Sequence, residues 1–131
     1  MGGFLLVDSP IYIDELRARR DPAESFDEAL RAGRLLTCGI IRCEVLRGIV
    51  KPIVHEKMRN LFLVIQGCSL DETLWSEAAD LAWKLDRRGI VLPLPDLAIA
   101  ACAFRHGATV VTTDGHFHSV PDLPVLDRIE Q

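Results

Sequence analysis

Residues 91–117 (VLPLPDLAIAACAFRHGATVVTTDGHF) hold two apolar segments of different character, separated by a single glycine. The first, residues 97–104, is rich in alanine and predicts a helix that starts near Pro95 and ends before Gly107. The second, residues 108–113, is short and rich in β-branched side chains, which is typical of a strand buried on both faces. Strands of that kind occur mainly in parallel sheets covered by helices, so this unit restricts the chain to an α/β architecture.

The same alternation of strand and helix extends over the rest of the chain. Further strands are predicted at residues 3–7, 35–38 and 123–126, with a small strand or turn at 69–74. Further helices are predicted at residues 9–20, 21–33, 40–51, 54–66 and 72–88, the last with Trp75 and Trp83 on its inward side. These elements predict a single domain over residues 1–131, a three-layer α/β/α sandwich around a parallel sheet of four to five strands.

Composition limits the classes of protein that remain. The 131 residues are 49% hydrophobic, which is enough for a sizeable core, but no apolar run is long enough for a membrane span. The N-terminus lacks the pattern of a signal peptide. The four cysteines form no Cys-x-x-Cys pair, so buried free thiols in a reducing cytoplasm are expected. The net charge of −4 does not indicate nucleic-acid binding. An acidic chain could still bind phosphates at a site where metal ions or local arginines make the local charge positive.

Four acidic residues are predicted to meet at one edge of the sheet. Asp8 and Asp114 each follow a strand directly. Asp96 begins the helix that precedes the second of these strands, and Glu44 lies one turn into the helix that follows residues 35–38. In open parallel sheets, ligands bind outside the carboxyl ends of the strands. Clustered carboxylates repel one another unless cations compensate, and oxygen ligands suit Mg²⁺ or Mn²⁺ better than zinc.

Each acid also has a purely structural explanation. Asp8 and Asp96 occupy the positions of helix N-caps, and Asp114 has the position of a turn residue. Glu44 has apolar neighbours, and an ion pair with Arg47 on the same helix would account for it. Four separate coincidences at one edge of a sheet are harder to accept than one metal site.

Other side chains are weaker candidates. Arg47 and Lys51 lie about one turn apart on the helix that carries Glu44 and are candidate phosphate contacts, although a solvated helix face explains them as well. His116 and His118 suggest zinc, but no further cysteine or histidine clusters near them in the sequence. The chain also lacks a Gly-rich phosphate loop and a cysteine with a convincing histidine partner.

Three segments, VDSPIYIDELR, IIRCEVLRG and PDLAIAACAFRHGATVVTTDGHF, resemble the PIN-domain ribonucleases. Within that family they resemble most the VapC-type toxins of bacterial toxin–antitoxin pairs. The resemblance extends from Leu5 to Phe117 and is weakest over residues 51–81. The acidic centre of the family falls on Asp8, Glu44, Asp96 and Asp114.

The resemblance implies a function, a cofactor and partners. The implied function is metal-dependent cleavage of RNA phosphodiester bonds by the toxin of a type II toxin–antitoxin pair, with Mg²⁺ or Mn²⁺ as the cofactor. Asp8, Glu44 and Asp96 would bind the ions, and Asp114 would complete the ligand shell or orient the attacking water. The resemblance further implies a five-stranded parallel sheet, a homodimer, and an antitoxin protein whose segment fills the site.

Some positions near the acids follow the family pattern and others depart from it. Ser9 fits the pattern and, with Thr112, is a candidate accessory polar residue. Pro10 departs, because the family usually has serine or asparagine there, and many relatives carry an acid in place of His116. Two alternatives stay open: a metal-dependent nuclease or phosphohydrolase that acts on a substrate other than RNA, and a PIN-like binding module that has lost its chemistry.

Overall fold

The computed structural model describes residues 3–129, and its centre is a parallel sheet. The strands are β1 (Leu5–Val7), β2 (Leu35–Cys38), β3 (Gln66–Cys68), β4 (Thr109–Val111) and β5 (Val125–Leu126). They lie in the order β3-β2-β1-β4-β5, and every neighbouring pair is parallel. The predicted α/β class and the parallel sheet are confirmed.

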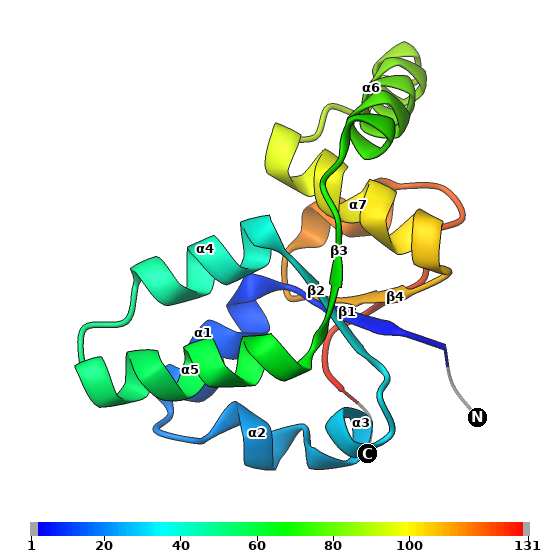
Figure 1. The fold of residues 1–131 in the computed structure, drawn as a ribbon. Helices are drawn as coiled ribbons and strands as arrows, with labels where there is room; N and C mark the ends of the chain where they lie inside the picture. Colours follow the sequence, from blue (N-terminus) through cyan, green and yellow to red (C-terminus); the bar gives the residue numbers. More distant parts are fainter. Residues whose placement is uncertain (1–2, 130–131) are drawn as a thin grey trace.

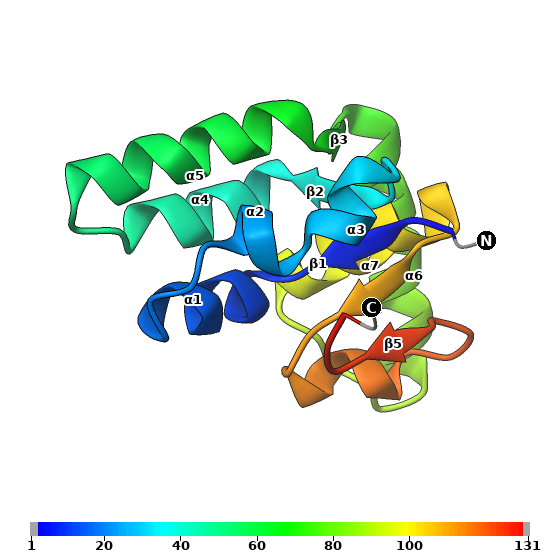
Figure 2. The same ribbon diagram turned by 90° about the horizontal axis from the view of Figure 1, so that it is seen from below.

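Helices surround this sheet. They are α1 (Ser9–Arg17), α2 (Pro22–Ser25), α3 (Asp27–Arg31), α4 (Gly39–Arg47), α5 (Pro52–Val64), α6 (Glu72–Arg87), α7 (Leu94–His106) and the 3-10 helix η1 (Gly115–Ser119). Figures 1 and 2 show α6 and α7 on one face of the sheet and α2 and α3 on the other, while α1, α4 and α5 pack together at one side. Within residues 3–129, every helix is too short or too polar to span a lipid bilayer.

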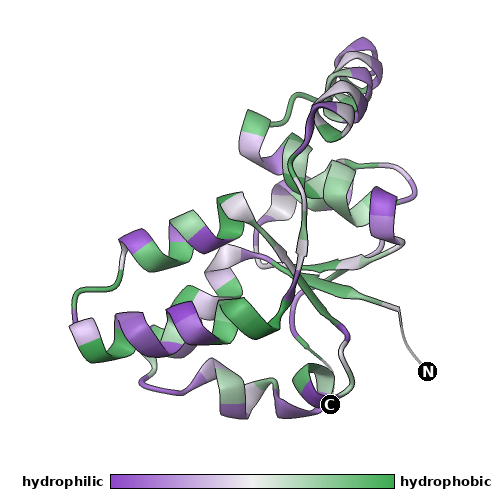
Figure 3. Ribbon diagram, viewed as in Figure 1, coloured by the Kyte–Doolittle hydropathy of each residue, from purple (hydrophilic) through white to green (hydrophobic). Residues whose placement is uncertain are grey.

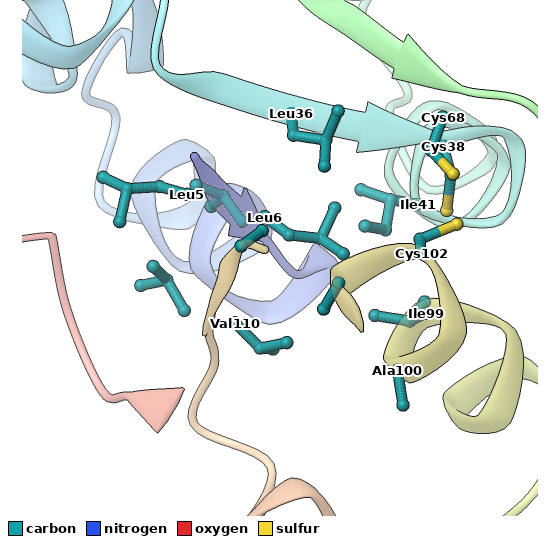
Figure 4. Packing of buried hydrophobic residues seen from close by; sticks show 14 of the residues in the cluster. Leu5, Leu6, Leu36, Cys38, Ile41, Cys68, Ile99, Ala100, Cys102 and Val110 are labelled. Carbon is teal, nitrogen blue, oxygen red and sulfur yellow. The ribbon is translucent and has the colours of Figure 1, made fainter. Parts of the chain in front are cut away.

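Helix α7 supplies much of the core on its face of the sheet. All of its residues from Leu97 to Ala103 are buried, and most of them are small, which lets the helix lie close to the strands. Figure 4 shows Ile99 of α7 in the same apolar cluster as Leu6 of β1 and Val110 of β4. Figure 3 shows hydrophobic residues along β1, β2 and α7, and hydrophilic residues recurring along α5 and α6. The alanine-rich run is therefore the buried helix that the sequence predicts.

Three aromatic rings join α1, α5 and the segment that contains α2 and α3. Tyr12 of α1 is fully buried, and its ring centre lies 5.6 Å from that of Phe26 and 5.2 Å from that of Phe62 in edge-to-face contacts. Phe26 stands between α2 and α3 with a backbone outside the helical range (φ −108°, ψ 23°). The turn that brings this ring into the core divides the single helix predicted over residues 21–33 into two.

The segment between α5 and α6 differs from the prediction. The structure has β3 at residues 66–68 and no strand at 69–74, where the chain leads to Asp71, the N-cap of α6. The β3 sequence, Gln-Gly-Cys, has no β-branched side chain, so its pairing with β2 determines its conformation rather than local propensity. Pro52 begins α5 because the first helical position needs no N–H donor, and the helix therefore starts earlier than predicted.

Two tryptophans of α6 lie outside the core, which corrects their predicted placement. The residues that α6 buries are Leu74, Ala78 and Leu85. Trp83 is 60% exposed and Trp75 is 38% exposed. The face of α6 that contacts α7 is therefore a narrow stripe, and both indole rings fall beside it.

The four cysteines are free thiols, as the sequence predicts, but not all of them are buried. Cys38, Cys68 and Cys102 are buried, and Figure 4 shows them grouped where β2 and β3 meet α7. Cys43 is exposed on α4, so the expectation of burial is wrong for this residue.

Gly107→Ala should destabilise the fold by about 1 kcal/mol. Gly107 ends α7 with a left-handed backbone (φ 61°, ψ 35°), and an added Cβ would meet no atom within 4 Å, so conformation alone causes the cost. The matched control is Gly48→Ala, which should be neutral or slightly stabilising because Gly48 ends α4 at an ordinary φ of −89°. Urea unfolding measures both effects, and equal destabilisation of the two variants would contradict this account.

Candidate metal centre

Asp8 lies directly after β1, at the point where the strand order reverses between β1 and β4. The residue is only 4% exposed. Its Oδ1 accepts a hydrogen bond from the backbone N–H of Ser9 (2.9 Å), and its Oδ2 accepts one from the hydroxyl of Thr112 (2.8 Å). The backbone N–H of Asp8 donates to the carbonyl of Val111 (2.9 Å). The residue is thus fixed where open parallel sheets bind their ligands.

The N-cap position of Asp8 does not by itself explain the direction of its carboxylate. An N-cap side chain usually accepts from the N–H of the second or third helical residue. In α1 the second residue is Pro10, which has no N–H, and the N–H of Ile11 donates to the backbone carbonyl of Asp8 (3.2 Å). The carboxylate therefore faces Ser9 and Thr112. Asp8 is an N-cap and a member of the acidic group at once.

Glu44, on α4, joins this group through Ser9. The buried hydroxyl of Ser9 donates to Oε1 of Glu44 (3.0 Å). Within the described residues Glu44 forms no ion pair with Arg47, so the simple structural explanation for this acid does not hold. The hydrogen bond between Ser9 and Glu44 links α1 to α4 beside the ends of β1 and β2.

The turn after β4 brings Asp114 into the same network. The hydroxyl oxygen of Thr112, which donates to Asp8, also accepts the N–H of Asp114 (3.0 Å). Oδ1 of Asp114 accepts the N–H of His116 (2.9 Å), as expected of a residue that begins a turn. The turn interpretation of Asp114 is therefore correct, and it coexists with a place in the acidic network.

Asp96 is the third residue of α7, and the N-cap of this helix is Pro93, so the interpretation of Asp96 as an N-cap is wrong. The helix begins at Leu94, one residue before the predicted start at Pro95, and Asp96 therefore lies in its first turn. Oδ2 of Asp96 lies 3.1 Å from Nδ1 of His116, and the same nitrogen lies 3.2 Å from Oδ1 of Asp114. Asp96, Asp114 and His116 each present one possible ligand atom within 4.8 Å of the others.

Burial and mutual repulsion raise the pKa values of Asp8 and Asp96. The pKa of Asp8 is raised from 3.8 to about 6, mainly by burial, and the charges of Glu44 and Asp96 add to the effect while two hydrogen bonds oppose it. The pKa of Asp96 is also raised, mainly by burial and additionally by the charge of Asp114, against the hydrogen bond to the neighbouring imidazole. A bound cation would relieve both the burial cost and the repulsion.

The donor set suits a divalent cation. Carboxylate oxygens predominate, with one imidazole nitrogen beside them. Among the described residues, the group with ligand atoms close enough to share an ion contains Asp96, Asp114 and His116. Asp8 is connected to this group by hydrogen bonds through Thr112, and Glu44 is connected to Asp8 through Ser9. All four predicted acids lie in one network, and their catalytic roles remain predictions.

Among the described residues, the remaining candidates, Arg47, Lys51 and His118, form no hydrogen bond or ion pair with this acidic group. Arg47 and Lys51 are exposed, and Lys51 lines a groove between α1, α4 and α5. The other basic residues of that groove are Arg17, Arg19, Arg20 and Lys57. His118 is exposed and lies outside the ligand group, so the structure does not support a zinc pair with His116. The contact of His116 with both carboxylates was not predicted, although its place two residues after Asp114 was the available signal.

Residues 5–123 match the family model of the PIN domain, and the chain belongs to that family. Among curated proteins, it is 28% identical over 127 residues to VapC ribonuclease Mb1587 of Mycobacterium bovis, with 93% of this chain and 95% of the relative covered. It is 26% identical over 123 residues to ribonuclease VapC4 of Mycobacterium tuberculosis, with 92% and 94% covered.

Solved structures share the fold at low sequence identity. VapBC2 from Rickettsia felis, bound to a DNA fragment from its promoter, has a TM-score of 0.74 at 18% identity and covers 93% of this chain and 96% of its own. A toxin–antitoxin complex from Klebsiella pneumoniae has a TM-score of 0.67 at 24% identity, with 97% and 99% covered. At these identities the comparison supports the fold alone.

In the presence of a chelator, Asp8→Asn should be more stable than the parent at pH 8, by roughly 1 to 3 kcal/mol. The folded-state pKa of Asp8, about 6, lies above the ordinary 3.8, so the folded parent binds the extra proton and loses stability as pH rises from about 4 to about 6. The neutral amide removes this loss. The difference between variant and parent should therefore fade toward pH 4.

The matched control for this prediction is Asp21→Asn. Asp21 is the N-cap of α2, and its carboxylate accepts the N–H of Ala23 (3.0 Å). Asparagine caps about as well as aspartate, so this variant should stay within about 0.5 kcal/mol of the parent. Chemical denaturation at several pH values measures both variants. An Asp8→Asn protein that is less stable than the parent at pH 8 would show that the buried charge is not costly.

Proposed function

We propose that this protein is a metal-dependent endoribonuclease that cleaves RNA phosphodiester bonds, built as a single domain over residues 1–131. The observation that carries the proposal is the hydrogen-bonded network that joins four acids on a PIN domain: Asp8, Glu44, Asp96 and Asp114. Curated relatives that cover nearly the whole chain are named ribonucleases, which supports RNA as the substrate.

The proposed cofactor is Mg²⁺ or Mn²⁺, held by Asp96 and Asp114 and, directly or through water, by Asp8 and Glu44. When bound, such ions make water nucleophilic and stabilise the negative charge that develops on a phosphodiester in the transition state. Thr112 keeps the buried Asp8 oriented, and Ser9 does the same for Glu44. Asp114 completes the ligand shell or orients the attacking water.

Basic side chains are the proposed contacts for the RNA backbone. Arg47 and Lys51 would bind phosphates on either side of the scissile bond. Lys51 belongs to a groove lined by further cations, which supports local attraction of a polyanion by a chain whose net charge is −4.

We also propose that the protein is the toxin of a type II toxin–antitoxin pair. The solved relatives include a toxin–antitoxin complex and a VapBC assembly, which supports a protein partner here as well. The proposed antitoxin places a segment over the acidic network and blocks access to it. The toxin itself would act in the cytoplasm, which agrees with the free rather than disulfide-bonded cysteines of this chain.

A homodimer is proposed from apolar side chains that the fold leaves uncovered. Leu63 and Val64, at the end of α5, are 74% and 71% exposed, and Ile53 at its start is 75% exposed. Leu63 and Val64 lie next to β3, a strand at the edge of the sheet. Contiguous exposed apolar residues mark interaction surfaces, and a symmetric pair of chains would cover them.

The purified protein should sediment as a dimer at about 50 µM, and Leu63→Glu should shift it to a monomer, because a charge at the interface opposes association. The matched control is Val91→Glu, since Val91 is 77% exposed but lies on the loop before α7. That variant should remain dimeric. A monomeric parent, or dissociation of both variants alike, would reject this surface as the interface.

Glu44→Gln and Asp96→Asn should each lower the rate of RNA cleavage by about 10- to 100-fold, because each removes a carboxylate from the proposed ion site. The control is Asp80→Asn, which changes an exposed acid on α6 and should leave the rate unchanged. Cleavage of a labelled RNA pool in Mg²⁺ measures the rates. Overexpression of the parent should arrest bacterial growth, and either site variant should relieve the arrest at equal protein levels.

The same assay separates the alternative functions. Cleavage of DNA or of 2′-O-methylated RNA as fast as of RNA would favour a broader nuclease or phosphohydrolase. Binding of Mg²⁺ or Mn²⁺ without cleavage of any RNA would favour a binding module with its chemistry lost. Equal activity of the parent and both site variants would contradict the acidic network as the catalytic centre.

A further inference from the structure

His116 occupies a particular place beside the acidic network. It is the second residue of η1, directly after the turn that Asp114 begins. Its side chain is 57% exposed, yet its Nδ1 lies 3.1 Å from Oδ2 of Asp96 and 3.2 Å from Oδ1 of Asp114. One nitrogen thus stands between two carboxylates that come from different elements, α7 and the turn after β4.

We propose that His116 is itself a ligand of the divalent ion, through Nδ1, together with Asp96 and Asp114. The site would then select Mn²⁺ and Zn²⁺ over Mg²⁺ more strongly than a site built of carboxylates alone. This inference rests on the ion site of the proposed function and adds a ligand and a selectivity to it.

The geometry supports this assignment. The three ligand atoms lie within 4.8 Å of one another. Bonds from Zn²⁺ to carboxylate oxygen and imidazole nitrogen are about 2.0–2.2 Å long, so two ligands of one ion lie no more than about 4.4 Å apart. The distances of 3.1 and 3.2 Å from Nδ1 of His116 to the two carboxylates are within that span. Without an ion, a proton on Nδ1 can bridge the same two carboxylates. A bound ion would therefore take the place of this proton between His116 and the two acids.

The chemistry of the nitrogen gives the selectivity. Mg²⁺ prefers oxygen ligands and gives up its water reluctantly, whereas imidazole suits Zn²⁺ and other transition metals. Asp8 and Glu44 cannot replace the imidazole in this respect, because their carboxylates offer only oxygen ligands. The preference for one metal over another would therefore be determined by Asp96, Asp114 and His116.

Pulsed EPR of the full-length protein loaded with Mn²⁺ tests the ligand directly. The parent should show the nitrogen hyperfine signal of a coordinated imidazole, and His116→Ala should lose it. The matched control is His118→Ala, which removes an exposed histidine outside the ligand group and should keep the signal. His116→Asp should also lose the nitrogen signal while it retains a bound ion.

Calorimetric titrations with Mn²⁺, Zn²⁺ and Mg²⁺ test the selectivity. In His116→Ala, the Kd for Mn²⁺ and Zn²⁺ should rise by at least about tenfold, while the Kd for Mg²⁺ should change by less than about threefold. His116→Asp should bind Mg²⁺ at least as well as the parent does. These measurements need no substrate, so a loss of cleavage from any other cause does not affect them.

The outcomes separate this inference from the function on which it rests. If Mn²⁺ binds the parent without a nitrogen signal, or if the signal persists in His116→Ala, His116 is only a hydrogen-bond partner of the acids and the inference is wrong. In that case the carboxylate site and the proposed nuclease stand. If neither Mn²⁺ nor Mg²⁺ binds the parent, the ion site fails, and the inference and the proposed mechanism are overturned together.

Discussion

The hydroxyl of Thr112 holds the acidic network together. It donates to the carboxylate of Asp8 and accepts the backbone N–H of Asp114, so one buried side chain orients the acids that follow β1 and β4. Because these two strands are parallel neighbours, they end side by side and deliver both acids to one place. Ser9 and His116 then extend the network to α4 and α7. The positions of Asp8 and Asp114 depend on this strand pair and on the hydroxyl between its ends.

The network works against the stability of the protein without a bound ion. Burial raises the pKa of Asp8 to about 6, so the charged carboxylate is costly at neutral pH. The apolar core offsets such costs, and α7 contributes seven consecutive buried residues, Leu97–Ala103, directly after Asp96. Helix α7 thus supplies both an acid of the site and much of the apolar packing that offsets the cost of burying charge. A well-packed support of this kind offsets the cost of the buried charge at the site.

Local sequence signals were sufficient for the elements that carry Asp8 and Asp114, because each buried strand changes abruptly to polar residues at its end. They were insufficient wherever distant segments decide the structure. β3 is a strand because β2 lies beside it, and Phe26 breaks a predicted helix because its ring packs against Tyr12. His116 reaches Asp96 across 20 residues because α7 and η1 are neighbours in the fold, which no local pattern indicates.

Pro10 affects the site because it has no backbone N–H group. The start of a helix normally presents several N–H groups that compete for a nearby carboxylate. In α1 the second of these groups is missing, and the third is directed to the carbonyl of Asp8 instead of its side chain. The helix therefore occupies only one oxygen of this carboxylate, through Ser9. A substitution that restored a donor at Pro10 would offer the acid a second partner within its own helix, and the helix would then compete with any ligand for its charge.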